Sequence, residues 1–243
     1  MWPSPGTRGP EHAKLPVVAT LSEVETALRA RGLEPRGAFH PDAADAVPAR
    51  SGGGPTRALL LAGSVGASLW HTFARERRAE PDPLDRWSER VLREVAAQFD
   101  AEVVLPSDGP PHPPFLRWAQ RAEAVHPSPL GLLIHPDHGL WHAYRGALAF
   151  ARRLELPARV ERPSPCTSCR ERPCLAACPV GAFTTAGYDD TACAAHLESG
   201  AGAACFESAC LARAACPVGR EHRYAPEQAR FHLRAFLRGR ARG

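Results

Sequence analysis

Eight cysteines in the last third of the chain are the residues whose type and spacing could do chemistry. In this sequence of 243 residues they form two groups of four: Cys166, Cys169, Cys174 and Cys178, then Cys193, Cys205, Cys210 and Cys216. The first group reads C-x2-C-x4-C-x3-C-P and the second C-x11-C-x4-C-x5-C-P. Closely spaced cysteines with a proline after the last one are typical of [4Fe–4S] ligation. The repeat therefore predicts two [4Fe–4S] clusters that transfer single electrons.

The last cysteine of each group is expected to serve the other cluster. In two-cluster ferredoxins the cysteine before the proline ligates the second centre rather than its own. We therefore expect one cluster on Cys166, Cys169, Cys174 and Cys216, and the other on Cys178, Cys193, Cys205 and Cys210. Each all-thiolate site is negatively charged, and four nearby arginines could offset that charge: Arg170, Arg172, Arg213 and Arg220.

The spacing leaves alternatives open. Four residues, Arg170 to Pro173, stand where the usual bacterial run has two, and the second group is looser still. A single cluster, with the second group degraded or binding another metal, is one alternative. Structural zinc is another, because zinc also accepts four cysteines, and a disulfide framework is a third. The two Cys-Pro steps favour iron–sulfur clusters.

Composition limits the class of protein. The net charge of +4 is too small to indicate nucleic acid by itself, and the sequence has no apolar stretch near the roughly 20 residues of a membrane helix. The first six residues, 1–6, lack the basic start and apolar core of a signal peptide. We therefore expect a cytoplasmic protein with no membrane partner, in which clustered thiols stay reduced and bind metal.

Hydrophobic periodicity predicts the elements that position the cysteines. Ser22 and Glu25 would form a capping box that opens a helix ending near Gly32. An apolar run at 57–62 predicts a buried strand, 63–66 a glycine-containing loop and 67–78 a helix. Asp82 and Pro83 would begin a long amphipathic helix, whose apolar stripe is Leu84, Trp87, Val91, Leu92, Val95 and Phe99.

Further elements follow along the chain. Residues 101–105 predict a strand and 115–124 a short helix. Strands at 130–135 and 143–150 would form a hairpin across the turn at 136–139. Pro157, Pro163 and Pro165 mark a linker into the cysteine region. A final helix at 226–237 closes the chain.

Two segments outside the cysteines carry a resemblance to a known family. Trp118-Ala119-Gln120-Arg121-Ala122 resembles the Trp-Ala-x-Arg-Ala helix of the epoxyqueuosine reductases, which are cobalamin-dependent iron–sulfur enzymes of tRNA modification. The segment 131–141, in which an apolar strand ends in Pro-x-x-Gly and an aromatic residue, is similar to the strand-turn segment of that family. The chain does not contain the C-terminal repeats of the tRNA enzyme, so nucleic acid is not an expected partner.

This resemblance implies an α+β protein: a nitroreductase-like α/β sandwich followed by a small dicluster ferredoxin-like domain and a closing helix. The implied domains are 15–157, an α/β domain that would bind a corrinoid, 158–224, a ferredoxin-type domain with two [4Fe–4S] clusters, and 225–243, a C-terminal helix with a basic tail. Cobalamin is the implied further cofactor, and a flavodoxin or ferredoxin the expected electron donor.

Other candidate site residues lie in the predicted α/β domain. Asp108 stands where the family has its proposed catalytic acid, although a turn aspartate before Gly109 has the same sequence. Gly63 and Gly66, between a strand and a helix, could expose backbone N–H groups to a cofactor phosphate or carboxylate, or simply form a tight turn.

The segment 135–142 supplies the remaining cofactor candidates, His135, Gly139 and Trp141. His135, His138 and His142 together could hold a metal or relay protons, or be solvated. In the C-terminal helix, an arginine-rich face could contact RNA or an acidic redox partner, or could be solvated; its residues are Arg230, Arg234, Arg238, Arg240 and Arg242.

The predicted function is single-electron transfer through two [4Fe–4S] clusters to a cofactor or substrate in the α/β domain, which would make the chain a small reductase. The alternatives are a non-enzymatic ferredoxin-like electron carrier and a cobalamin-handling protein whose clusters reduce the bound cobalt.

Overall fold

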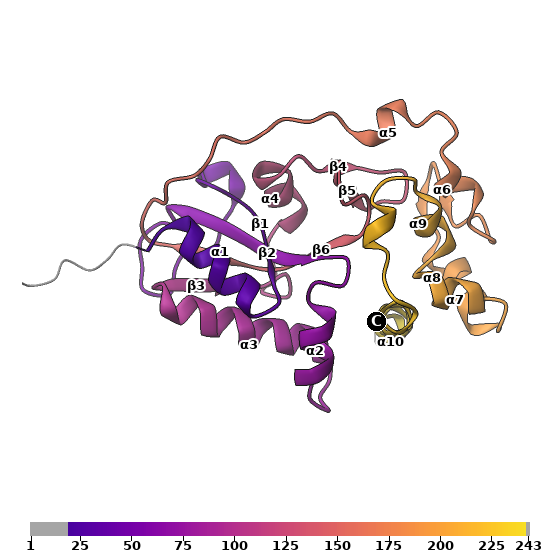
Figure 1. Cartoon of the computed structure of the whole chain (residues 1–243), viewed down its shortest axis with the longest axis horizontal. Helices are drawn as coiled ribbons and strands as arrows, with labels where there is room; N and C mark the ends of the chain where they lie inside the picture. The colour runs from indigo at the N-terminus through magenta and orange to yellow at the C-terminus, as the bar shows by residue number, and fades with distance from the viewer. Residues whose placement is uncertain (1–18, 242–243) are drawn as a thin grey trace, which may run out of the picture.

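A four-stranded antiparallel sheet organises the first two thirds of the chain (Figure 1). The computed structural model describes residues 19–241, so the segment on which the signal-peptide prediction rests lies outside the described residues. The strand order is β1-β2-β6-β3, with β1 at Glu34–Phe39, β2 at Ala58–Val65, β6 at His142–Phe150 and β3 at Ala101–Val104.

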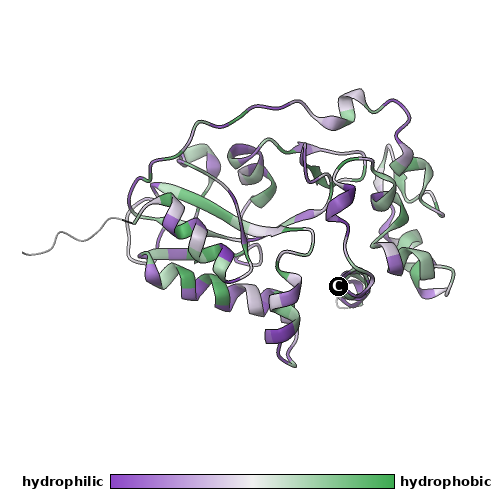
Figure 2. Cartoon of the chain, in the orientation of Figure 1, coloured by the Kyte–Doolittle hydropathy of each residue, from purple (hydrophilic) through white to green (hydrophobic). Residues whose placement is uncertain are grey.

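The two central strands are buried because helices cover both faces of the sheet. Leu60 of β2 opposes Leu148 of β6, and both belong to the core under α1 (Leu21–Ala30) and α3 (Pro83–Gln98). The alternate residues Leu59 and Leu61 pack instead with Trp118 of α4 (Phe115–Ala122). Figure 2 shows β2 hydrophobic over most of its length, as a strand enclosed on both faces must be.

Most of the local predictions are confirmed. The helices α1, α3 and α4 and the strands β2 and β3 form within a few residues of their predicted bounds. In the apolar stripe of α3 every predicted residue is buried except Phe99, which is partly buried. The predicted capping box is wrong by two positions: the Thr20 hydroxyl accepts from the Glu23 N–H at 3.3 Å, and the Glu23 carboxylate accepts from the Thr20 N–H at 2.6 Å.

The predicted hairpin at 130–150 is wrong. The strand β5 (Leu133–Ile134) is only two residues long and pairs with β4 (His126–Pro127), whereas β6 lies between β2 and β3. The reason is that the last five residues of β6 are apolar on both faces of the sheet. A strand of this kind can bury both faces only at the centre of a sheet. The predicted turn does form, because His135 and Gly139 are bridged.

The predicted loop at 63–66 is also wrong in extent. The strand β2 continues to Val65, which pairs with His142, and α2 begins only at Trp70 (Trp70–Glu76). A shift of register between Ala62 and Gly63 accommodates the extension. Gly63 permits this close pairing, since a Cβ there would lie 1.8 Å from the Ala143 carbonyl oxygen.

The cysteine region consists of short helices around a two-stranded hairpin. The chain crosses from the sheet through 151–164 without helix or strand. It then forms α5 (Pro165–Ser168), α6 (Pro173–Ala176), β7 (Phe183–Thr184), β8 (Gly187–Tyr188), α7 (Asp190–Glu198), α8 (Ala203–Ser208) and α9 (Leu211–Ala215). One-turn 3-10 helices also occur at Ala43–Asp45 and Arg220–His222.

The last helix, α10 (Pro226–Arg240), contacts both parts of the chain. Its Phe231 ring packs edge-on against Trp70 at 5.4 Å and Phe73 at 5.3 Å, in the core of the α/β part. Gln228 donates to the Gly66 carbonyl at 3.1 Å, and α8 lies alongside (Figure 1). No helix within 19–241 is both long and apolar enough to cross a membrane.

Candidate metal centres

Cys166, Cys169, Cys174 and Cys216 surround one cavity of about 300 Å³. Three of them come from α5, α6 and the turn between these helices, and Cys216 comes from the C-terminal end of α9. The thiol of Cys174 interacts electrostatically with Cys166, Cys169 and Cys216, and burial is the main reason that its pKa is raised. We refer to these four thiols as the first centre.

Cys178, Cys193, Cys205 and Cys210 form a second group of neighbouring thiols. Cys205 interacts electrostatically with Cys193 and Cys178, and Cys210 with Cys205 and Cys193. Burial raises the pKa of Cys205 and of Cys210. The backbone at Cys210 has φ 93°, a region that non-glycine residues rarely occupy, which indicates that surrounding structure holds this thiol in place. These four thiols are the second centre.

Backbone N–H groups point at several of the sulfurs. The Ala182 N–H lies 3.3 Å from the Cys178 sulfur. Four further thiols have a pKa that burial raises and that a backbone N–H donor lowers in part. The donors are Leu175 for Cys174, Leu211 for Cys205, Arg213 and Ala212 for Cys210, and Val218 for Cys216. Such donors stabilise the thiolate form, which is the form that binds metal.

The donor set suits a metal cluster with four thiolate ligands. All eight cysteines are free thiols, so the disulfide alternative has no pairing in this structure. Among the described residues, no three His, Cys, Asp or Glu side chains form a group that could hold a single metal ion such as zinc. Four corners of an iron–sulfur cube stand farther apart than ligands placed about 2.3 Å from one zinc ion. The four thiols around the first cavity are the set that such a cube requires.

Two of the four predicted arginines act on a thiol. Arg172 lowers the pKa of Cys166 and Arg220 that of Cys216, each against the larger opposing effect of burial. Arg213 has another role: its guanidinium lies 4.5 Å from the centre of the Trp141 ring and 4.6 Å from that of Tyr224. It also donates to the Leu140 carbonyl at 3.1 Å.

Tyr188 is a second-centre residue that the sequence analysis missed. The pKa of Tyr188 is raised, by burial of its hydroxyl first and then by the neighbouring Cys193 thiol. Its ring stacks on Phe183 at 5.0 Å and lies 6.4 Å from Phe236 of α10. The only available signal was its place between the two cysteine groups, five residues before Cys193.

The structure gives structural roles to Asp108, Gly63 and Gly66. Asp108 is exposed, and its carboxylate accepts from the Leu105 N–H at 2.8 Å, which is the contact of a turn aspartate. Gly63 lies within β2 against the backbone of Ala143. The Gly66 N–H donates to the Trp141 carbonyl at 2.7 Å. The predicted anion-binding loop at 63–66 is therefore absent, because these groups belong to the sheet and its continuation.

The segment 135–142 lies against the first centre. Gly139 is in backbone contact with Val218, two residues beyond Cys216. Trp141 is fully buried, with Tyr224 edge-on at 5.2 Å. These two residues join the α/β part to the cysteine region, and their contact with a cofactor stays a prediction.

The three predicted histidines form a line of ring contacts. His222, which the sequence analysis did not identify, extends this line. His135 and His138 stack at 4.2 Å, and the His138 Nδ1 lies 3.3 Å from the His222 Nε2. Burial, and then His135, lowers the pKa of His138 to about 4. His142 is buried more deeply, with Nε2 3.0 Å from the Leu133 carbonyl oxygen, and its pKa is also lowered. The rings of His138 and His142 are therefore neutral at pH 7, and none of the four histidines belongs to a metal site among the described residues.

A buried ion pair, also missed in the sequence, lies on the sheet. Arg36 is 1% exposed and binds the Glu123 carboxylate through two nitrogens, at 3.0 and 2.8 Å. The Tyr144 hydroxyl donates to the same carboxylate at 2.9 Å, and the pKa of Tyr144 is raised by burial and by Glu123. Since 87 residues separate Arg36 from Glu123, no local pattern links them.

Comparison with known proteins adds no family to this description: no protein-family model matches the chain, and neither does any curated protein. What the fold and the site define is a mixed α+β protein in which two groups of four thiols lie beside a helix-covered sheet.

Proposed function

We propose that the chain binds two [4Fe–4S] clusters with exchanged cysteine ligands and transfers single electrons. One observation supports this most strongly. Cys216, from the second half of the repeat, lies with the three cysteines that open the first half, whereas Cys178, from the first half, lies with those of the second. This exchange is the arrangement of two-cluster ferredoxins.

A bound [4Fe–4S] cluster supplies a site that accepts and returns one electron. The chain's own groups would hold it and adjust its potential. The thiolates bind iron, while N–H donors such as that of Ala182 stabilise charge on sulfur. The apolar side chains of Leu130, Ile134 and Leu140 pack beside Cys216 and cover that side of the first centre.

The two centres share two short stretches of chain. Cys174 of the first centre and Cys178 of the second are separated by three residues at α6, and Cys210 and Cys216 stand at opposite ends of α9. The contact between α6 and α9 brings these stretches together. This proximity supports electron exchange between the clusters.

Metal and sulfide analysis of the protein purified without oxygen tests the proposal. We expect about eight iron atoms and about eight sulfides per chain, with absorbance that dithionite bleaches. About four of each would reduce the proposal to one cluster, and zinc without iron would contradict it.

The α/β domain is the proposed location of the electron acceptor. Cobalamin stays a prediction, and the structure does not support it at three of the five residues named for it, because Gly63, Gly139 and Trp141 are enclosed by protein. Titration with cobalamin separates the functions: a shift of the corrinoid spectrum would favour a reductase, and an unchanged spectrum the electron carrier.

A further inference from the structure

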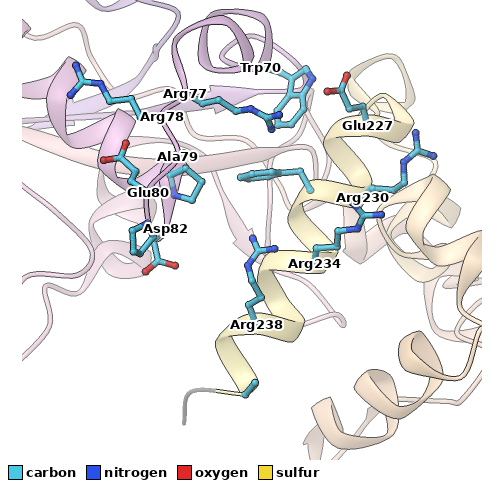
Figure 3. A pocket seen from close by; sticks show the side chains of 14 residues that line it. Trp70, Arg77, Arg78, Ala79, Glu80, Asp82, Glu227, Arg230, Arg234 and Arg238 are labelled. Atoms are coloured by element: carbon cyan, nitrogen blue, oxygen red, sulfur yellow. The ribbon is translucent and has the colours of Figure 1, made fainter.

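A cavity of about 970 Å³ lies between the segment after α2 and the exposed face of α10 (Figure 3). Its floor is apolar, with Trp70 and Phe231 in edge-on contact. Its rim is basic, since five arginines and only three carboxylates line it: Arg77, Arg78, Arg230, Arg234 and Arg238, with Glu80, Asp82 and Glu227. We call this feature the arginine groove.

The arginines of α10 form one stripe. Arg230, Arg234 and Arg238 recur every fourth residue, so their side chains share a helix face and span about 12 Å along the axis. Arg77 extends from the end of α2 on the other side of the groove, whereas Arg78 points away from α10 (Figure 3). Within 19–241, neither Arg77 nor Arg234 forms an ion pair with a carboxylate.

The opposite side of α10 leads to the second centre. Phe236 lies between Arg234 and Arg238 in sequence and therefore on the other side of the helix. Its ring lies 6.4 Å from the ring of Tyr188, and Tyr188 interacts with the Cys193 thiol. Two ion pairs, Arg230 with Glu207 and Arg240 with Asp190, fasten α10 to α8 and α7.

We propose that the arginine groove is the docking surface for an acidic one-electron carrier protein. The proposal rests on the function proposed above. The reduced carrier would give one electron to the cluster of the second centre, across about 10 Å of helix. The carrier is oxidised by one electron, the cluster is reduced by one, and no atom is transferred.

Charge and exposure favour an acidic protein over nucleic acid. Single-stranded nucleic acids need exposed aromatic faces on which bases stack, but Trp70 is 4% exposed and its ring packs against Phe231. Exposed arginines around an apolar floor are typical of a protein interface. Opposite charge on the carrier would accelerate its encounter with the groove.

Stopped-flow reduction of the oxidised, cluster-loaded full chain tests the docking surface. The donor is a pre-reduced acidic plant-type [2Fe–2S] ferredoxin at about 50 mM salt. The variant Arg77→Glu/Arg234→Glu should reduce the second-order rate constant about tenfold or more, and Arg77→Gln/Arg234→Gln by a smaller factor. In the wild type the rate should also fall as salt is raised to about 500 mM.

The matched control is Arg57→Glu, an exposed arginine before β2, at the end of that strand remote from α2. It should leave the rate constant unchanged. Methyl viologen reduced by dithionite, a small cationic donor, should reduce all variants as well as the wild type, which verifies that their clusters are intact.

Equal rates with ferredoxin for the wild type and the Glu variant would overturn the docking proposal. The proposal would also be overturned if the groove bound an RNA oligonucleotide through these arginines and the Glu variant kept the wild-type rate with ferredoxin. If the wild type contains no cluster that reduced viologen can reduce, the proposed function itself fails, and this outcome is distinct from a failure of docking.

Discussion

Gly139 and Val218 are in backbone contact: a Cβ on Gly139 would lie 2.0 Å from the Val218 carbonyl oxygen. The contact is reciprocal, because a Cβ on Gly219 would lie 2.4 Å from the carbonyl of His138. Both glycines have positive φ, at 57° and 68°. The turn of the α/β part is therefore fitted directly against the Cys-Pro-Val-Gly segment that carries Cys216.

Replacement of Gly139 by alanine should destabilise this junction. The new methyl group collides with the backbone, which cannot yield as a flexible side chain would, and φ is unfavourable for alanine. We expect a loss of about 2–4 kcal/mol in the free energy of unfolding, measured with urea.

Gly131→Ala is the matched control. Gly131 has φ 73°, but a Cβ there would meet no atom within 4 Å, so this variant should lose only about 1 kcal/mol from backbone strain. Equal losses in the two variants would show that the contact with Val218 contributes nothing.

Pairs of cysteine substitutions distinguish exchanged from unexchanged ligation. With exchange, Cys178→Ser/Cys193→Ser removes two ligands of one cluster and should leave about four iron atoms per chain. Cys174→Ser/Cys178→Ser damages both clusters and should leave almost none, although these residues are closer in sequence. The opposite result in iron analysis of the two double variants would mean that each half of the repeat ligates its own cluster.

Loss of Glu123 should be costly, since it leaves Arg36 buried without its carboxylate. We expect Glu123→Ala to reduce the free energy of unfolding by about 3–5 kcal/mol. Tyr144→Phe removes only one hydrogen bond to the same carboxylate and should cost about 1 kcal/mol. In the variant Arg36→Met/Glu123→Leu, apolar side chains replace both charges and should recover much of the loss. A loss below about 1 kcal/mol in Glu123→Ala would contradict the burial argument.

Stability should fall in mild acid, and His232 is one of the groups responsible. Burial, then Arg145 and Arg213, lowers the pKa of His232 to about 4 from the ordinary 6.5. Below pH 6.5 the unfolded chain therefore binds a proton that the folded chain does not bind until about pH 4, and stability decreases across that range. Between about pH 7.5 and 5.5 this histidine should cost about 1 kcal/mol.

His232→Phe keeps a ring beside Tyr224 and Phe231 but cannot titrate. The variant should lose correspondingly less stability between these two pH values in urea unfolding. A pH dependence identical to that of the wild type would show that His232 makes no such contribution.

Elements with strong local patterns could be predicted from the sequence, and those decided by distant partners could not. The apolar stripe of α3 and the apolar run of β2 indicate in their own residues that these elements are buried, because a helix and a central strand each have a typical hydrophobic periodicity. The pairing of β6 depends on β2 and β3, so the hairpin prediction, which weighed only the neighbouring turn, was wrong.

The same division applies to the candidate site. The Cys-Pro repeat indicated which thiols would be neighbours, and the structure gathers those thiols, although their ligation stays a prediction. The contact between Tyr188 and Phe236 joins residues 48 positions apart in the sequence. No spacing rule connects such residues, so the route from α10 to the second centre became visible only in three dimensions.

The position of α10 has a consequence for how the molecule is made. Phe231 completes the aromatic core of the α/β part, while Arg230 and Arg240 fasten the helices that carry the second centre. The sheet and all eight cysteines of a nascent chain are therefore synthesised before this helix. Consolidation of the aromatic core and attachment of the helices that carry the second centre would then occur together, once α10 has been synthesised.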